Sequence, residues 1–123
     1  MKKKNGFTML ELCCVIAIIA TLISTVMPMY KKSVDRAKEA ALKQDLQVFR
    51  KLISEYYKDN DKWPRSLEDL VSEGYMRAIP EDPITRSKTT WVYIPSEEGE
   101  HDLYDVKSGA DGESLDGIKY SEF

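Results

Sequence analysis

The most chemically informative residue in this sequence is Glu11, a single carboxylate beside an apolar run. Residues 12–29 carry no charged side chain, so Glu11 stands at the edge of 18 uncharged positions. A carboxylate at the centre of a membrane costs roughly 2.5 to 3.5 kcal/mol on insertion scales, and less near the interface. We therefore expect Glu11 to have a cationic partner close by.

A second set of candidate ligands lies in the glycine-rich segment 108–117. Asp111, Glu113 and Asp116 alternate there with three glycines, and Ser108 precedes them. Neighbouring carboxylates repel one another unless water or a cation neutralises them. Ca2+ takes six to eight oxygen ligands, backbone carbonyls included, and glycines let a tight loop turn its carbonyls inward. Composition alone leaves a solvated acidic turn and a calcium loop both open.

The remaining side chains do not predict catalysis. The single histidine, His101, falls in an expected turn, and Cys13 and Cys14 are adjacent inside the apolar run. Neighbouring helical side chains point about 100 degrees apart, so these cysteines form no ordinary intrachain disulfide. Asp82 precedes Pro83 and is interpreted as a turn carboxylate rather than an acid catalyst. With no G-x-S-x-G motif and no phosphate-binding glycine loop, the sequence predicts a protein that is not an enzyme.

The apolar run is long enough to cross a membrane. A helix over residues 7–30 would span about 36 Å at 1.5 Å per residue, which exceeds the hydrocarbon thickness of a bilayer. Three lysines at positions 2–4 precede it, so the positive-inside rule keeps the N-terminus cytoplasmic and sends the C-terminal part out. Pro28 lacks an N–H and is expected to kink or loosen this helix late in the run.

The residues K-K-K-N-G-F-T-M-L-E-L carry a family resemblance. A short basic leader ends in Gly6, Phe7 follows, Glu11 is the fifth residue after the glycine, and an apolar helix comes next. This pattern resembles the leader of the type IV pilin-like family, closest to the major pseudopilin of type II secretion systems. The resemblance implies cleavage between Gly6 and Phe7 by a prepilin peptidase, N-methylation of Phe7, and a role for Glu11 in assembly. Glu11 would pair with the Phe7 amine of its own or a neighbouring subunit.

The resemblance also implies a four-part chain with a structural function. Residues 1–6 would be the cleaved leader, 7–30 the transmembrane and fibre-core helix, 31–59 an amphipathic spine helix, and 60–123 a small periplasmic α+β head. Subunits anchored in the inner membrane would polymerise into a pseudopilus that drives type II protein secretion, extending through the periplasm or outside the cell. The implied partners are prepilin peptidase, an inner-membrane platform protein, an assembly ATPase, minor pseudopilins and an outer-membrane secretin.

The pattern beyond the membrane segment predicts an α+β fold. An apolar stripe spaced 4, 3, 4 and 3 residues apart continues the helix to about residue 59: Leu42, Leu46, Phe49, Ile53 and Tyr56. Ser66 and Asp69 are expected to cap a short helix at 67–73, which Gly74 ends. Residues 91–94 and 102–106 predict a β-hairpin, and a third strand is expected near 118–120. The small antiparallel sheet would lie across the spine helix.

The resemblance extends to the acidic segment. D-V-K-S-G-A-D-G followed by S-L-D-G is similar to the calcium loop of major pseudopilins. The matching positions are Asp111 and Asp116 by side chain and Ser108 by its carbonyl. This loop is shorter and offers one Asp where the family often has two in succession, so calcium binding and loss of the metal both remain open.

Charge is divided between the two ends of the sequence. Residues 1–65 carry 13 Lys and Arg against 7 Asp and Glu, and residues 66–123 carry 5 against 14, which gives net charges of +6 and −9. An acidic outer half argues against nucleic-acid binding, which needs clustered Lys and Arg. Residues 30–58 have a net charge of +4, so we hypothesise that each acidic head contacts the basic helix of a neighbour. Reversing Lys31, Lys32 and Arg36 to Glu is then expected to reduce assembly.

Two alternative functions remain open from the sequence. A type IV pilus subunit for adhesion, motility or DNA uptake shares the leader pattern, although such pilins often carry a C-terminal disulfide that this chain cannot form. A monomeric, membrane-anchored calcium-binding module would keep residues 1–6 and remain unassembled.

Overall fold

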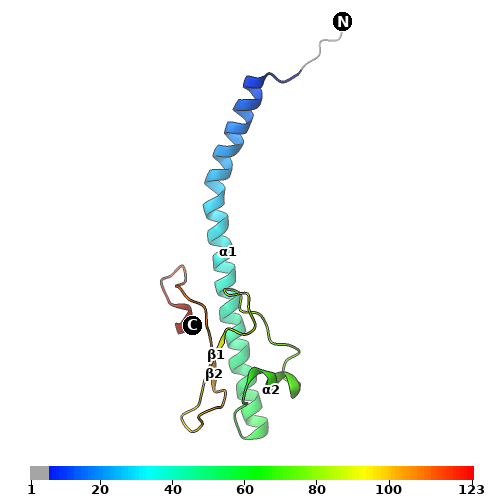
Figure 1. Ribbon diagram of the computed structural model, residues 1–123, viewed down its shortest axis with the longest axis vertical. Helices are drawn as coiled ribbons and strands as arrows, with labels where there is room; N and C mark the ends of the chain where they lie inside the picture. Colours follow the sequence, from blue (N-terminus) through cyan, green and yellow to red (C-terminus); the bar gives the residue numbers. More distant parts are fainter. Residues whose placement is uncertain (1–5) are drawn as a thin grey trace. The chain divides into compact units, whose positions relative to one another are not determined.

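The computed structural model describes residues 6–123, so five of the six residues of the expected leader lie outside the described residues. Its elements, in chain order, are α1 (Met9–Asn60), α2 (Leu67–Ser72), β1 (Trp91–Ile94), β2 (Asp105–Ser108) and the 3-10 helix η1 (Tyr120–Glu122) (Figure 1). The chain divides into two compact units after Val34. We call residues 6–34 the N-terminal unit and Asp35–Phe123 the C-terminal unit.

The long helix α1 has 52 residues and is unbroken at Pro28, which lies inside it. A capping box begins it, because the Glu11 N–H donates to Thr8 Oγ1 at 3.1 Å and the Thr8 N–H donates to Glu11 Oε2 at 3.3 Å. The pattern Thr-x-x-Glu before an apolar run is a local signal for a helix start. Glu11 therefore positions the first turn of α1 as well as standing beside the apolar run.

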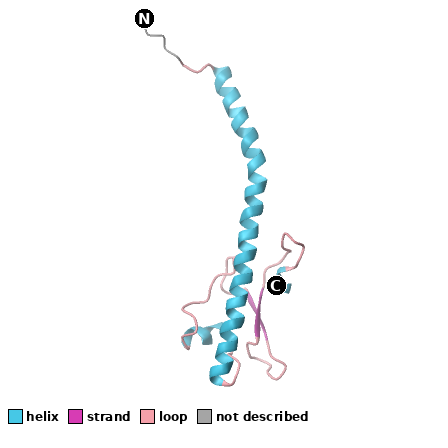
Figure 2. Ribbon diagram, turned by 180° about the vertical axis from the view of Figure 1, so that it is seen from behind, coloured by secondary structure: helices cyan, strands magenta, loops and turns pink. Residues whose placement is uncertain are grey.

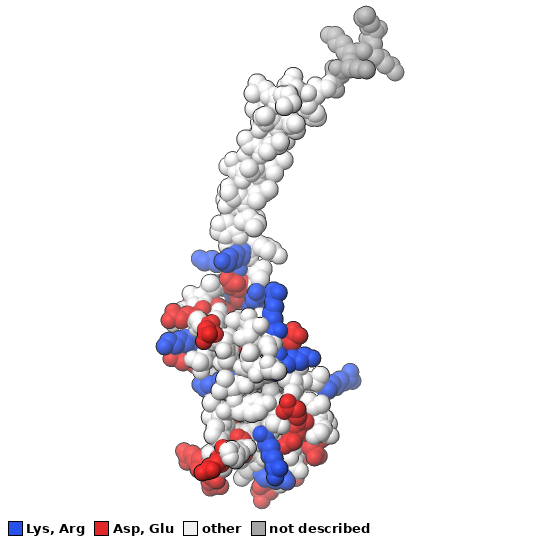
Figure 3. All heavy atoms as spheres, in the orientation of Figure 1, with Lys and Arg blue, Asp and Glu red and all other residues white. Residues whose placement is uncertain are grey.

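The large apolar side chains of residues 7–30 in the N-terminal unit are exposed. Their exposed fractions run from 44% at Val15 to 83% at Phe7. Among residues 6–123, α1 is the one helix long and apolar enough, by length and composition, to cross a membrane. Its hydroxyls bond within the helix, as where Thr21 Oγ1 donates to the Ala17 carbonyl at 2.8 Å. On the face shown in Figure 3, most of the N-terminal unit is uncharged, whereas Lys, Arg, Asp and Glu are scattered over the C-terminal unit.

The core of the C-terminal unit forms on the predicted stripe of α1. Its five members are at most 6% exposed, and they pack with residues of α2, the hairpin and the adjoining loop: Leu67, Leu70, Trp91, Leu103 and Val106. The ring of Phe49 meets the ring of Trp91 edge-on at a centroid distance of 4.9 Å. Figures 1 and 2 show α2 and the hairpin flanking this part of α1, which confirms the predicted α+β fold.

The hairpin pairs β1 and β2 antiparallel, with Trp91 opposite Ser108 and Ile94 opposite Asp105. β1 has the predicted bounds, but β2 begins three residues later than predicted. The reason is that Leu103 is buried away from the ladder and its N–H donates to the Pro64 carbonyl at 2.7 Å. The segment before β2 therefore anchors to the turn after α1 through Leu103, and it contacts the end of β1 through the Tyr104 N–H, which donates to the Ile94 carbonyl at 2.9 Å.

Two local predictions in the C-terminal unit are wrong. The third strand expected at 118–120 is replaced by one isolated bridge between Glu113 and Lys119 and by η1. At α2, Ser66 makes no side-chain cap bond, and Asp69 Oδ2 instead accepts the Arg65 N–H at 2.9 Å. Asp69 thus reaches one residue further back than a capping box requires.

Candidate functional site

The N-terminal site consists of Gly6, Phe7 and Glu11. Gly6 and Phe7 are exposed and lie before α1 begins, so their backbone is not held in the helix. The Glu11 carboxylate turns back toward the start of α1, where it accepts the Thr8 N–H. An amino group on Phe7 would stand one residue before that N–H, at the end of the helix toward which Glu11 already points. The positive end of the helix dipole also favours a carboxylate there.

Ser108 connects the hairpin to the C-terminal loop. It is 1% exposed, its hydroxyl donates to Asp82 Oδ2, and it accepts the Ala110 N–H at 3.1 Å. Asp82 is fully buried and its other oxygen accepts the Ile84 N–H at 2.8 Å, so Asp82 is the turn carboxylate that the sequence predicted. Burial, and then the charge of Asp82, raise the pKa of the Asp45 carboxyl on α1. No local pattern indicates the contact between Ser108 and Asp82, which lie 26 positions apart.

The structure brings two of the three expected calcium ligands to one surface hollow. Ser108 and Asp111 line this hollow with Glu113 and Lys119, whereas Asp116 is not among its lining residues. In the described part of the chain, no three His, Cys, Asp or Glu side chains gather as a metal site. Two exposed carboxylates and one carbonyl supply fewer oxygens than the six to eight that Ca2+ takes. A bound ion would need further carbonyls or water.

Glu39 holds the C-terminal loop to α1. It is 7% exposed, and its Oε1 accepts the Leu115 N–H at 2.8 Å and the Tyr120 hydroxyl at 3.4 Å. Burial, and then the Glu39 carboxylate, raise the pKa of the Tyr120 phenol. Sequence reasoning gave Glu39 no role, although it continues the spacing of the apolar stripe one step before Leu42. A carboxylate at a core position was the signal that could have found it.

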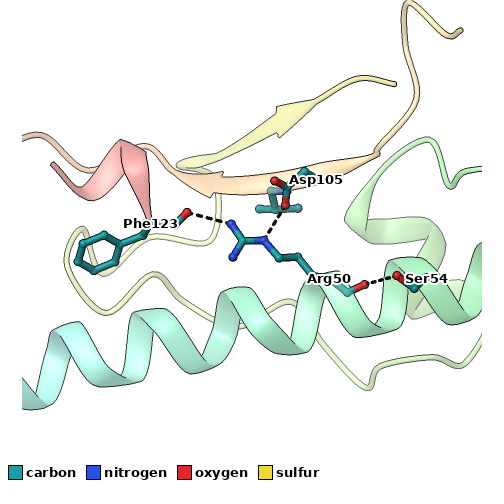
Figure 4. A network of polar contacts seen from close by, with 5 residues as sticks. Arg50, Ser54, Asp105 and Phe123 are labelled. Carbon is teal, nitrogen blue, oxygen red and sulfur yellow. Dashed lines mark hydrogen bonds and ion pairs between the residues drawn. The ribbon is translucent and has the colours of Figure 1, made fainter. Parts of the chain in front are cut away.

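Arg50 ties α1 to β2 and to the last residue (Figure 4). Its Nε donates to Asp105 Oδ1 at 2.9 Å and its Nη2 donates to the Phe123 backbone oxygen at 2.9 Å. The Lys43 ammonium also lies 5.0 Å from the centre of the Phe123 ring, which is within cation–π range. Glu39 and Arg50 together hold two parts of the C-terminal segment to one helix.

Comparison with known proteins identifies the family. Residues 1–27 match the Prokaryotic N-terminal methylation motif. The chain is 32% identical to the type II secretion system core protein G of Escherichia coli, over 90% of this chain and 85% of that protein. It is 29% identical to the protein of the same name from Pseudomonas aeruginosa, over 90% of this chain and 87% of that protein. It is also 29% identical to the protein of the same name from Klebsiella pneumoniae, over 96% of this chain and 94% of that protein. No solved structure matches the chain.

The methylation motif and the curated relatives confirm the resemblance that the leader residues indicated. The chain belongs to the type II secretion system core protein G family.

Proposed function

We propose that this chain is a pseudopilin, a structural subunit that polymerises into the pseudopilus of a type II secretion system. The observation that carries the proposal is the N-terminal unit, whose apolar side chains are exposed although the same helix builds a packed core further on. An uncovered apolar surface of this kind needs a bilayer or other copies of the chain to cover it. Membership of the core protein G family points to the same structural role.

Processing at the N-terminus would prepare the subunit for assembly. A prepilin peptidase would cut between Gly6 and Phe7, and Phe7 would then be N-methylated, in keeping with the methylation motif over residues 1–27. Glu11 would pair with the new ammonium of its own or a neighbouring subunit. Within residues 6–30 Glu11 is the one ionisable side chain apart from the two cysteines and Tyr30, so such a pair would select the register between packed helices.

The apolar part of α1 and the family fit a single-pass, membrane-anchored protein. We place the anchor in the inner membrane with the C-terminal unit in the periplasm, because lysines precede the apolar run. An assembly ATPase and a platform protein would extract subunits into a fibre that also contains minor pseudopilins and that pushes exported proteins through an outer-membrane secretin.

Calcium binding at the C-terminal loop is a separate part of the proposal. Asp111, Asp116 and the Ser108 carbonyl would supply oxygens, and the exposed carboxylates leave room for water ligands. Removing calcium with a chelator should then lower the melting temperature of the full chain in detergent, and Asp111→Asn should remove that response. A melting temperature unchanged by calcium or chelator would refute the metal site.

The intact mass of the chain recovered from membranes tests the main proposal. In cells with prepilin peptidase, the mass should lack residues 1–6 and carry one extra methyl group, and cells without the peptidase should yield the full chain. Glu11→Ala should still be cleaved but should form few fibres. An uncleaved chain in peptidase-competent cells would favour the monomeric anchored module instead.

A further inference from the structure

An aromatic cluster lies on the surface of the C-terminal unit near the end of α1. Tyr57 stacks on Trp63 with ring centres 4.2 Å apart, and Trp63 meets Tyr104 edge-on at 5.0 Å. Tyr57 is 38% exposed and Tyr104 is 51% exposed, so these rings present part of their faces to solvent. Together with Pro95, Glu97 and Glu98 they line one surface depression, which we call the acidic aromatic groove.

The rim of the acidic aromatic groove is the acidic loop 96–102, whose two ends are joined by hydrogen bonds. Ser96 donates its N–H to Asp102 Oδ1 at 2.7 Å and its hydroxyl to Asp102 Oδ2 at 2.5 Å, which closes the loop between them. A Cβ at Gly99 would lie 2.3 Å from Asp102 Oδ2, so this turn leaves no room for a larger residue while Asp102 stays bonded. The backbone that carries the exposed residues Glu97, Glu98 and Glu100 is therefore held by these bonds.

A cation fits the acidic aromatic groove best. Aromatic faces attract Lys and Arg, and carboxylates at the edge of the site add a Coulomb attraction for the same cations. The adjoining hollow carries Lys62 and Arg65, but four carboxylates also line it: Asp61, Glu98, Glu100 and Asp102. The surroundings of the groove thus remain acidic overall.

The chain itself carries a matching cationic segment. Lys31, Lys32 and Arg36 are exposed on α1, and within residues 6–123 the one ion pair is that between Arg50 and Asp105. Arg36 and Tyr57 are 21 positions apart on α1, or about 31 Å along the helix at 1.5 Å per residue. One copy therefore cannot place its own Arg36 in its own groove.

We propose that the acidic aromatic groove of one copy binds the basic segment Lys31, Lys32 and Arg36 of a second copy. This inference rests on the proposed function, because it supplies a contact between pseudopilin subunits. The two surfaces differ, so each copy offers a groove to one neighbour and a basic segment to another. Such a heterologous contact builds an open filament rather than a closed dimer.

Charge reversal tests the contact in cells that assemble fibres from the full chain. The loop variant replaces Glu97, Glu98 and Glu100 with Lys, and the segment variant replaces Lys31, Lys32 and Arg36 with Glu. Each variant should lower the yield of sheared fibres by about tenfold, and the two combined should restore it to within about twofold of wild type. Replacing Lys31 and Lys32 with Glu does not oppose the expected membrane orientation, because fewer positive charges then follow the apolar run.

Matched controls carry the same charge changes away from the acidic aromatic groove and the basic segment. They replace Glu73, Glu81 and Glu122 with Lys, or Arg77, Arg86 and Lys88 with Glu, and all six side chains are exposed. These controls should retain fibres. Loss of fibres in the controls would mean that net charge matters and not this contact. The combined variant keeps the wild-type net charge, so no restoration of fibres there would mean that the two surfaces do not pair. Either result would overturn the inference.

Paired cysteines give a direct reading of the contact. In a Cys13→Ala and Cys14→Ala background, Glu98→Cys with Arg36→Cys should yield covalent multimers on oxidation, while Glu73→Cys with Arg36→Cys should stay monomeric. If wild type forms no fibres, the proposed function fails and the inference fails with it. If wild-type fibres form and the loop variant assembles equally well, the inference alone is overturned. The same conclusion holds if the loop variant assembles equally well but blocks export.

Discussion

The two halves of α1 share one backbone but differ in what surrounds their side chains. Leu22, in the N-terminal unit, is 62% exposed, whereas Leu46, in the C-terminal unit, is 1% exposed. The helix itself does not produce this difference, because α2 and the hairpin cover only the part of α1 that lies in the C-terminal unit. The comparison shows that packing within the chain stabilises the C-terminal unit. The apolar surface of the N-terminal unit instead needs a bilayer or other copies of the chain to cover it.

The largest effect is expected from truncating matched leucines in the two halves. Leu46→Ala should lower the free energy of unfolding of the C-terminal unit by about 3 kcal/mol, because it leaves a cavity in a packed core. Leu22→Ala should change that free energy by less than about 0.5 kcal/mol, because the Leu22 side chain is 62% exposed and lies outside the core. Urea unfolding of the full chain in detergent micelles, followed by tryptophan fluorescence, measures both. Equal losses would contradict the contrast between the two halves.

A smaller effect is expected where two backbone segments of the C-terminal unit lie close together. A Cβ at Gly109 would lie 2.2 Å from the Thr90 carbonyl oxygen, so Gly109→Ala must push β1 and the C-terminal loop apart. We expect a loss of about 2 kcal/mol, typical of overpacking. Gly117→Ala is the control, since Gly117 has open space around it and only its positive φ of 79° is strained. Urea unfolding should rank Gly109→Ala as the more damaging change, and the reverse order would count against a close backbone contact.

The sequence predicted the features that depend on local patterns. The spacing of Leu42 and Leu46 on the stripe gave the buried face of α1, and the Thr8 to Glu11 capping box, which was missed, also had a local signal. Contacts between distant segments had no such signal. Glu39 and Leu115 are 76 positions apart, and only the packed fold brings the loop N–H to that carboxylate. Pairing across such distances depends on tertiary packing, which residue spacing does not encode.

Arg50 links the two ends of the C-terminal unit with a modest expected energy. Its side chain is 40% exposed and that of Asp105 is 25% exposed, so water screens the pair. Arg50→Gln should therefore cost about 1 kcal/mol, with part of the loss coming from the bond to the Phe123 carbonyl. A double-mutant cycle with Asp105→Asn isolates the ion pair, which should weaken in high salt. A coupling energy that salt does not change would argue against an electrostatic link.

The smallest effect is expected in the acidic loop, where it depends on pH. The side-chain and then the backbone hydrogen bonds from Ser96 lower the pKa of Asp102 below its ordinary value. A carboxyl with a lowered folded-state pKa adds stability above its unfolded pKa of about 3.9 and loses that stability as pH falls through the lower folded value. The bond from the Ser96 N–H should therefore persist at pH 5 and open only in stronger acid.

The amide shift of Ser96, followed by NMR in micelles from pH 6 to pH 2, measures this transition. Its midpoint should lie below about 3.9, the ordinary pKa of Asp. Asp102→Asn should remove the transition. The amides of residues 12–29 should show no such transition, because this segment carries no Asp or Glu. A midpoint at or above the ordinary value would mean that Ser96 does not brace the loop. The rim of the acidic aromatic groove would then be free to move, and its carboxylates would bind a cationic segment less tightly.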